Sequence, residues 1–572
     1  MNQKEPARRP LPATEHAMQI VDAGRIVHNR NKAVPLPGPH QVVVQMEACG
    51  LCFSDTKLLH AFSSHPRKSV VLSGLDAGVL AEIPSYVPGG LPTVPGHEPV
   101  GRIVAAGEQV RRHRVGERCL IQTDYRQLTT VAANAAFGYN FEGGLQQYVV
   151  LDERVIIEPG TDERFLIPVG EEPSASAVAL VEPWACVEAS YVYRERRGPL
   201  SGGRLLVVAD AAHPVGSIAA VIEHARPARV TAVLAETTQQ RTIMAAADPA
   251  VTIAADIASL PRQSFDDIVY FGADAGTIEA LADLLAFQGI INIVTGGDSI
   301  GRPIALDIGR VHYDLTRWVG TTGESAGDGY TAIPEDGELR AGDRMAVIGA
   351  AGPMGLMHVV RAASAGWDGL SITALDIDDA RLGHLGRAAG QIARSHGVGL
   401  AVVNSSNRKV EPGFSYIALM VPAPPLVGEA VALAGPGGRI NIFAGFASGT
   451  RAQIDLDSYL DRRCYFLGTS GSGIPDMKAV LRKLESGELD TNISLDAVAG
   501  FEGVADALAA IEGRTAAGKI MVYPSLPELG LVRLSELGER FPTVVAALDD
   551  GRWTKAAEQE LLRVASSSEA PA

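Results

Sequence analysis

The chain has few cysteines, few aromatic residues and no excess of positive charge. Its five cysteines are an odd, widely scattered set among 572 residues, which excludes a disulfide scaffold and favours a reducing compartment. The 50 basic residues face 66 acidic ones, for a net charge of −16. This balance argues against nucleic acid or an anionic membrane surface as the main partner. We therefore expect a small-molecule partner.

Long apolar runs are also missing. No stretch of 18 apolar residues is present, and no apolar signal-peptide core follows the charged start of the chain. We therefore expect a cytoplasmic protein that makes no use of a membrane. Hydrophobic residues make up 46% of the chain and charged residues 20%, which is typical of a folded protein with sizeable cores. At roughly 150 residues per domain, the length suggests about four structural units.

A tandem duplication determines the expected architecture. Several landmarks recur in the same order, each about 140 to 149 residues after its first occurrence. The matched segments are 203–208 with 343–348, 214–216 with 353–355, 265–268 with 414–417, 289–293 with 438–442, and 319–321 with 467–469. We expect two similar domains over residues 201–323 and 342–470.

Each copy has the pattern of alternating strands and helices. Continuous apolar runs at 204–208 and 345–348 suit parallel strands that are buried on both faces, which predicts doubly wound α/β units. Residues 38–156 show short apolar strands separated by glycine and proline turns, which predicts a β-rich domain.

The second copy contains a glycine-rich turn typical of dinucleotide binding. Gly349, Gly352 and Gly355 lie between an apolar strand and a predicted helix. Such glycines let the backbone approach a pyrophosphate, and the helix start attracts its charge. Asp376 ends the next strand and is predicted to bind a ribose diol and to repel a 2′-phosphate, so NAD(H) is expected in preference to NADP(H). The predicted cofactor site is completed by Pro353 and Met354.

The first copy keeps only the last glycine of this turn. Asp210 and His213 stand where a pyrophosphate would approach, although Glu236 still ends the second strand. Two interpretations stay open: a degenerate copy kept for packing, and a second nucleotide-binding unit.

The β-rich part supplies donors for a metal ion. Cys52, His97, Glu98 and Glu182 offer one thiolate, one imidazole and two carboxylates. Three protein ligands and an open position suit a catalytic zinc ion that polarises an alcohol or carbonyl oxygen. Each residue alone also fits a structural role as a core thiol, a turn histidine or a solvated acid. Cys49 and Cys52 form a Cys-x-x-Cys pair, which also fits a redox motif or half of a structural zinc site, but no second cysteine pair follows, so neither is expected.

These motifs resemble the zinc-dependent medium-chain dehydrogenases, which include alcohol, threonine and sorbitol dehydrogenases. The second copy looks most like the sorbose-phosphate-reductase-like branch. The resemblance covers most of residues 38–523 if one copy is treated as extra. It rests on the segments 50–55, 95–101, 115–118, 143–148, 182–187, 352–355, 468–472, 501–508 and 518–522.

The resemblance implies roles for individual residues. Cys52, His97 and Glu182 match zinc ligands, and Glu98 matches the acid that approaches or exchanges onto the metal. Ser54 matches the start of a proton relay.

Asp55 matches the carboxylate that hydrogen-bonds the metal-binding histidine on the side away from the metal.

The sequence departs from the family pattern at two places. Lys57 occupies the position expected for the relay histidine, and the segment after Cys119 lacks the cysteines of the family's structural zinc lobe. One catalytic zinc ion and no structural zinc ion are therefore expected.

The implied fold class is α/β, with a GroES-like β-rich catalytic domain and two tandem doubly wound Rossmann domains. The expected divisions are 1–200 for the catalytic domain, 201–323 and 342–470 for the Rossmann copies, 471–526 for a segment that completes the catalytic domain, and 527–572 for a helical tail.

The implied function is a zinc-dependent oxidoreductase. It would move hydride between NAD(H) and a secondary hydroxyl or ketone of a polyol, sugar or sugar phosphate. One alternative is a redox-neutral epimerase or isomerase with nucleotides in both Rossmann copies. Another is a pseudo-dimer whose extra copy is purely structural. The sequence also allows a homo-oligomer.

Overall fold

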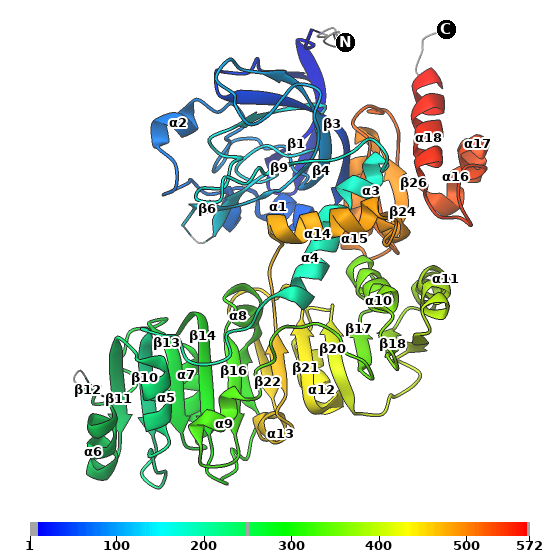
Figure 1. Ribbon diagram of the computed structural model, residues 1–572. Coiled ribbons are helices and arrows are strands. Elements are labelled where there is room, and N and C mark those ends of the chain that lie inside the picture. Colours follow the sequence, from blue (N-terminus) through cyan, green and yellow to red (C-terminus); the bar gives the residue numbers. More distant parts are fainter. Residues whose placement is uncertain (1–9, 132, 248–250, 569–572) are drawn as a thin grey trace. The chain divides into compact units, whose positions relative to one another are not determined.

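The computed structural model describes residues 10–131, 133–247 and 251–568, so the outermost parts of the predicted segments 1–200 and 527–572 lie outside it. The chain forms two compact units (Figure 1), one from residues 1–186 and 471–572 and the other from residues 187–470. The first division follows Cys186, whereas the sequence predicted it at residue 200. No helix within the described ranges is long and apolar enough to cross a bilayer.

The first unit is built around an eight-stranded sheet. Its order is β26-β24-β25-β3-β4-β5-β9, with β8 beside β3. Three of these strands come from beyond residue 490, so the C-terminal part of the chain is built into the sheet. The predicted helical tail therefore also contributes a short strand, β26. The strands are β3 (Gln41–Leu51), β4 (Glu98–Ala106), β5 (Arg118–Ile121), β8 (Tyr148–Asp152), β9 (Leu166–Pro168), β24 (Leu495–Ala499), β25 (Lys519–Val522) and β26 (Val532–Arg533).

Two hairpin ribbons and short helices complete this unit. The ribbons are β1 (Thr14–Asp22) with β2 (Arg25–Ala33) and β6 (Asp124–Thr129) with β7 (Asn134–Ala136). The helices are α1 (Phe53–Ala61), α2 (Ala77–Ala81), α3 (Ala175–Ala179), α14 (Ile474–Glu485), α15 (Val504–Glu512), α16 (Leu537–Arg540), α17 (Pro542–Val545) and α18 (Lys555–Ser568), and α4 (Val181–Val192) leads into the second unit.

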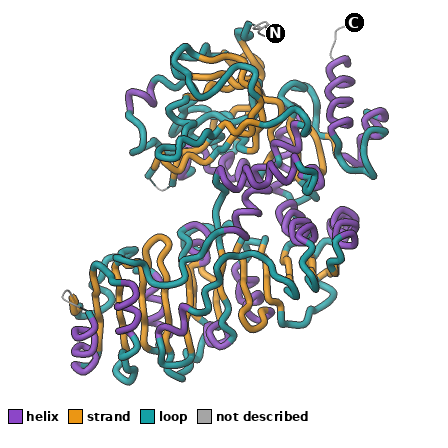
Figure 2. Tube along the Cα trace, in the orientation of Figure 1, coloured by secondary structure: helices purple, strands orange, loops and turns teal. Residues whose placement is uncertain are grey.

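The second unit contains two six-stranded parallel sheets with the same strand order. Figure 2 shows the strands of this unit in orange with helices in purple beside them. The first runs β12-β11-β10-β13-β14-β16 and the second β19-β18-β17-β20-β21-β23, which is the doubly wound order of dinucleotide-binding folds. The first-sheet strands are β10 (Arg204–Ala209), β11 (Arg229–Leu234), β12 (Val251–Ile253), β13 (Phe265–Phe271), β14 (Leu285–Val294) and β16 (Arg317–Thr321). The second-sheet strands are β17 (Arg344–Ile348), β18 (Ser371–Asp376), β19 (Gly399–Asn404), β20 (Phe414–Leu419), β21 (Ala434–Ile442) and β23 (Tyr465–Leu467).

Burial along the central strands explains the parallel sheets. In β10 and β17 every residue after the first is buried, because helices of the alternating pattern cover both faces. The predicted α/β fold class is confirmed. The helices are α5 (Ile218–Ala225), α6 (Thr237–Ala246), α7 (Ala275–Ala282), α8 (Ile308–Tyr313), α9 (Ala326–Tyr330), α10 (Pro353–Ala365), α11 (Asp379–Ser395), α12 (Pro424–Leu433) and α13 (Leu456–Asp461).

Equivalent elements of the two copies pack against each other. β15 (Ile304–Asp307) and β22 (Arg451–Ile454), which occupy the same place in each copy, form an antiparallel ribbon. Its register pairs Ile304 with Ile454 and Asp307 with Arg451, so each copy offers its partner the same segment. This is the self-complementary pairing expected of a two-fold interface, here within one chain.

Arg317 of the first copy forms a buried ion pair and also contacts the second copy. Its guanidinium group donates to both oxygens of Glu195, at 2.8 and 2.9 Å, and to the carbonyl of Gly468 in the second copy at 2.9 Å. Both side chains of the ion pair are 3% exposed. A buried pair of this kind is costly to break from one side, because the remaining charge has no partner.

We expect Arg317→Met to lower the free energy of unfolding of the second unit by about 3–5 kcal/mol, because it leaves the buried Glu195 carboxylate without its charged partner. The matched control is Arg204→Met, which removes an equally bidentate but half-exposed partner of Asp266. It should cost about 0–1 kcal/mol. Urea unfolding followed by circular dichroism compares the two, and equal losses would contradict this assignment.

Candidate active site

The end of β3 places the cysteine of the predicted metal site. Cys52 is the residue immediately before α1, and its backbone amide donates to Asp55 Oδ2 at 2.9 Å. This contact is one half of a capping box, in which Asp55 in the first turn of the helix binds back to the residue that precedes the helix. Cys52 Sγ lies 3.8 Å from Ser54 Oγ.

The same Asp55 carboxylate positions the histidine. Its other oxygen accepts from Gly96 N at 3.1 Å and lies 3.3 Å from His97 Nδ1. This contact leaves Nε2 of the imidazole as the nitrogen available to a metal. Burial alone would lower the pKa of His97, but Asp55 raises it well above its ordinary value. Burial tends to raise the pKa of Asp55, and His97 and the two backbone amides lower it overall.

Three of the four predicted metal ligands come together. The donor atoms of Cys52, His97 and Glu98 all lie within 4.8 Å of one another. Glu98 is fully buried, and its Oε2 has no hydrogen-bond partner among the described residues. A Cβ atom at Gly50 would lie only 2.3 Å from this oxygen, so a glycine is needed there to make room for the carboxylate. One sulfur, one nitrogen and an unsatisfied carboxylate oxygen fit a zinc ion.

The other oxygen of Glu98 is held by a buried lysine. Lys519 Nζ lies 2.5 Å from Glu98 Oε1, and both side chains are almost completely buried. Lys519 reaches this position because β25 pairs antiparallel with the end of β3, Ile520 facing Leu51. Burial alone would lower the pKa of Lys519, but the Glu98 carboxylate raises it. This lysine therefore offsets one negative charge of the donor cluster.

Glu182, the fourth predicted ligand, stands beside this group but outside it. It lies in the first turn of α4, and its carboxylate is not among the atoms within 4.8 Å. Burial and the charge of Glu98 raise the pKa of Glu182 to about 7. Cys186, one turn later, places its thiol 3.6 Å from Glu182 Oε1, and burial raises the pKa of that thiol well above its ordinary value.

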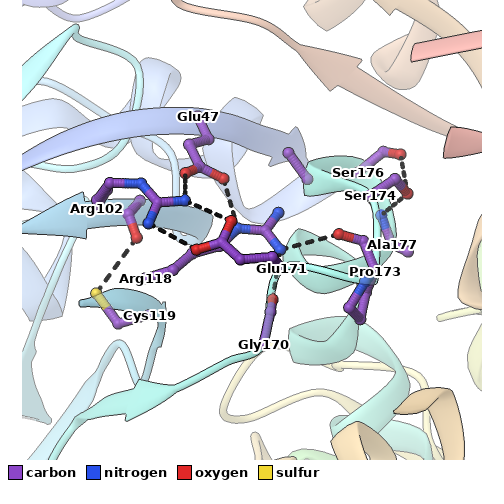
Figure 3. A network of polar contacts seen from close by, with 12 residues as sticks. Glu47, Arg102, Arg118, Cys119, Gly170, Glu171, Pro173, Ser174, Ser176 and Ala177 are labelled. Carbon is purple, nitrogen blue, oxygen red and sulfur yellow. Dashed lines mark hydrogen bonds and ion pairs between the residues drawn. The ribbon is translucent and has the colours of Figure 1, made fainter. Parts of the chain in front are cut away.

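A network of ion pairs and hydrogen bonds holds the segment of the chain that precedes α3 (Figure 3). Arg118 binds Glu47 at 2.7 Å and donates to the carbonyls of Gly170 and Pro173, both at 2.9 Å. Arg102 joins Glu47 to Glu171. The backbone that leads into the Glu182 helix is therefore anchored to the central sheet.

The C-terminal helix caps the same segment. Glu558 of α18 is buried, and its two oxygens accept from Ala175 N at 2.7 Å and Ser176 N at 2.8 Å, at the start of α3. Tyr523 donates its hydroxyl to the same carboxylate at 2.9 Å. An anion at this position satisfies free amides and matches the positive end of the helix.

The predicted dinucleotide turn lies in the second unit. It follows β17 at the place where the strand order reverses, which is where ligands bind in such sheets. Gly349 has a left-handed φ of 82°, and a Cβ atom at Gly355 would lie 2.4 Å from the Gly349 carbonyl oxygen. Gly352 has no crowding neighbour and immediately precedes α10, whose first two residues are Pro353 and Met354. The glycines keep side chains out of the turn, while the amides of Gly349 and Ala350 both donate to the Leu375 carbonyl.

Asp376 closes β18 beside this turn. Its carboxylate accepts from Ala351 N at 3.0 Å and from Arg381 at 3.2 Å. Arg381 also pairs with Asp378. Arg381 is thus already engaged by two acids.

The equivalent turn of the first copy is filled by its own side chains. Gln239 donates to the carbonyls of Asp210 and His213, both at 2.8 Å, and Tyr270 donates to Asp210 Oδ2 at 2.6 Å. Glu236 is exposed and precedes α6.

Comparison with known proteins identifies the relatives. Residues 38–160 match the alcohol dehydrogenase GroES-like domain. The chain is 28% identical over 300 residues to mannitol-1-phosphate 5-dehydrogenase of Aliivibrio fischeri, covering 46% of this chain and 67% of the relative. It is 27% identical over 182 residues to D-altritol 5-dehydrogenase of Agrobacterium fabrum, covering 30% and 44%. The chain is a relative of the zinc-type medium-chain dehydrogenases.

The resemblance inferred from the motifs is thereby confirmed. Among solved structures, 2R,3R-butanediol dehydrogenase from Bacillus subtilis aligns with 89% of this chain and all of its own, at 15% identity and a TM-score of 0.50. That similarity concerns the fold. The dehydrogenase fold thus includes both the GroES-like domain and the Rossmann-like sheets.

Three residues in or near the candidate site were not revealed by the motifs. Lys519 lies within the segment 518–522, but nothing local links it to Glu98. Tyr139, whose ring centroid lies 5.8 Å from that of His97, and Glu558 come from segments without any motif. Lys57 is exposed and its ammonium group lies 5.6 Å from the Phe53 ring centroid.

We expect Glu558→Gln to lower the free energy of unfolding of the first unit by about 1–3 kcal/mol, because a buried charge-assisted cap of α3 is lost. Glu560→Gln on the same helix changes an acid whose partner, Arg563, is exposed, and should lower the free energy of unfolding much less. Thermal and urea unfolding compare them. Similar losses for both variants would show that Glu558 is not a cap.

Proposed function

We propose that this protein is a zinc-dependent, NAD(H)-linked dehydrogenase. Its substrate would carry a secondary hydroxyl or ketone on a polyol, sugar or sugar phosphate. The observation that carries the proposal is the group formed by Cys52, His97 and Glu98, with Asp55 behind the histidine. The names of the polyol dehydrogenase relatives support the substrate class.

Cys52, His97 and Glu98 would hold the metal, with Glu182 as the further carboxylate. A bound zinc ion would act as a Lewis acid toward the substrate oxygen. Asp55 fixes the imidazole orientation of His97, which keeps Nε2 directed to the metal.

Ser54 would act on the substrate proton, and Lys519 would balance charge at the metal site. Ser54, close to Cys52 Sγ, is the group that we propose relays the hydroxyl proton outward, accepting it from the substrate while passing on its own proton. Lys519 holds one oxygen of Glu98, so that the other oxygen alone is free to approach the metal.

The cofactor would bind at the turn of the second copy. Its amides would face the pyrophosphate, and Asp376 would accept hydrogen bonds from the adenosine ribose. The preference for NAD(H) is supported by the negative charge of Asp376 and by the pairing of Arg381 with it. An epimerase would need a nucleotide in the first copy too, where Gln239 and Asp210 occupy the turn, so we favour the dehydrogenase.

We expect the purified protein to bind about one zinc ion per chain, and Cys52→Ala to lose that zinc and at least about 10²-fold of turnover, because the thiolate is a direct ligand. Cys464→Ala is the control, since this buried cysteine lies in the second unit. Elemental analysis and a polyol oxidation assay measure both quantities. Zinc retained by Cys52→Ala would contradict the assigned ligand.

We expect Asp376→Asn to weaken NADH binding by about tenfold, because a charged acceptor for the ribose hydroxyls is lost. The difference in affinity between NADH and NADPH should therefore become smaller. Glu236→Gln, the equivalent acid of the first copy, should change neither. Fluorescence titration of both nucleotides provides the measurement. A stronger effect of Glu236→Gln would assign the cofactor to the first copy.

A further inference from the structure

The second unit contains a cavity that the proposed dehydrogenase chemistry does not use. Its volume is about 520 Å³, and five arginines line it: Arg197, Arg340, Arg439, Arg462 and Arg463. We refer to this cavity and its five arginines as the basic pocket. The arginines come from separate parts of the chain, which the fold brings to one place.

The basic pocket lies at the amino ends of the strands of the second sheet, and the dinucleotide turn lies at their carboxyl ends. Arg439 pairs with Tyr416 close to the start of β20, so it marks the amino ends of these strands. The glycine-rich turn follows the carboxyl end of β17. Because the strands are parallel, their amino and carboxyl ends lie on opposite sides of the sheet, and the pocket is therefore not part of the cofactor site.

Most of the positive charge in the basic pocket is not neutralised. None of the described carboxylates forms an ion pair with Arg197 or Arg340, and both residues are exposed. Arg462 donates to the carbonyls of Val431, Ala432 and Ala434, and thus to no acid. Arg463 donates to the Asp328 carbonyl and the Thr331 hydroxyl.

Few carboxylates of the described residues pair with these arginines or line the cavity. Arg439 alone among the five has a carboxylate partner, Asp343, at 2.6 Å. Of the two acids that line the cavity, Glu335 is paired with Arg194 and only Asp461 is left. In a chain of net charge −16, such a concentration of positive charge in a concave site favours an anion.

The chemistry of the lining indicates which anion. Guanidinium groups match phosphate oxygens with paired hydrogen bonds, and several converging arginines suit a group with more than one negative charge. The cavity also presents apolar surface from Ile333, Pro334 and Pro436, and its volume is that of a small-molecule site. We propose that the basic pocket binds a phosphorylated small organic molecule, separately from the cofactor and the metal.

The test is calorimetric titration of the full-length protein with glucose 6-phosphate and with inorganic phosphate, at fixed ionic strength and with NADH present. The test variant is Arg197→Gln/Arg340→Gln, whose side chains form no hydrogen bond or ion pair with the described residues and whose loss should not affect folding. The control is Arg229→Gln/Arg241→Gln, which removes the same charge from exposed arginines outside the pocket.

We expect saturable binding of glucose 6-phosphate to the wild type, tighter than that of inorganic phosphate because of the apolar lining. The test variant should bind at least about tenfold more weakly, and the control should match the wild type. Dehydrogenase activity should be unchanged in both variants, so this result is independent of the proposed function. Absence of saturable binding, or equal weakening in both variants, would overturn the proposal.

Discussion

The buried carboxylate of Asp55 joins the two segments that form the candidate metal site. One oxygen holds Cys52 at the start of α1, and the other holds the turn at Gly96 and faces His97. These segments are separated by more than 40 residues, so one anion keeps the thiol and the imidazole at a common position. Because Asp55 occupies Nδ1, the other imidazole nitrogen is left for a metal, and the arrangement of the remaining donors depends on this contact.

The C-terminal part of the chain contributes the balancing contacts. Lys519 neutralises one oxygen of Glu98 from β25, and Glu558 caps the helix that precedes Glu182. The return segment is therefore part of the electrostatics of the centre as well as of its sheet. In the second unit, Arg317 plays a comparable part, since its guanidinium group forms a buried pair with Glu195 and donates to the Gly468 carbonyl of the second copy.

Local patterns in the sequence predicted much of this structure. The duplication and its apolar runs predicted two parallel sheets, and the spacing of Gly349, Gly355 and Asp376 predicted a turn that the structure places at the reversal of strand order. Lys519, Glu558 and the basic pocket could not be predicted in this way. Each depends on contacts between segments far apart in the chain, which are set by sheet register and packing, and a single sequence carries no local signal for them.

We propose that Cys52, His97 and Glu98 together hold one zinc ion. X-ray absorption spectroscopy at the zinc edge of the zinc-loaded protein tests this assignment. We expect a single sulfur neighbour at about 2.3 Å together with nitrogen and oxygen neighbours at about 2.0–2.2 Å. A shell of several sulfurs, or one without any sulfur, would contradict it.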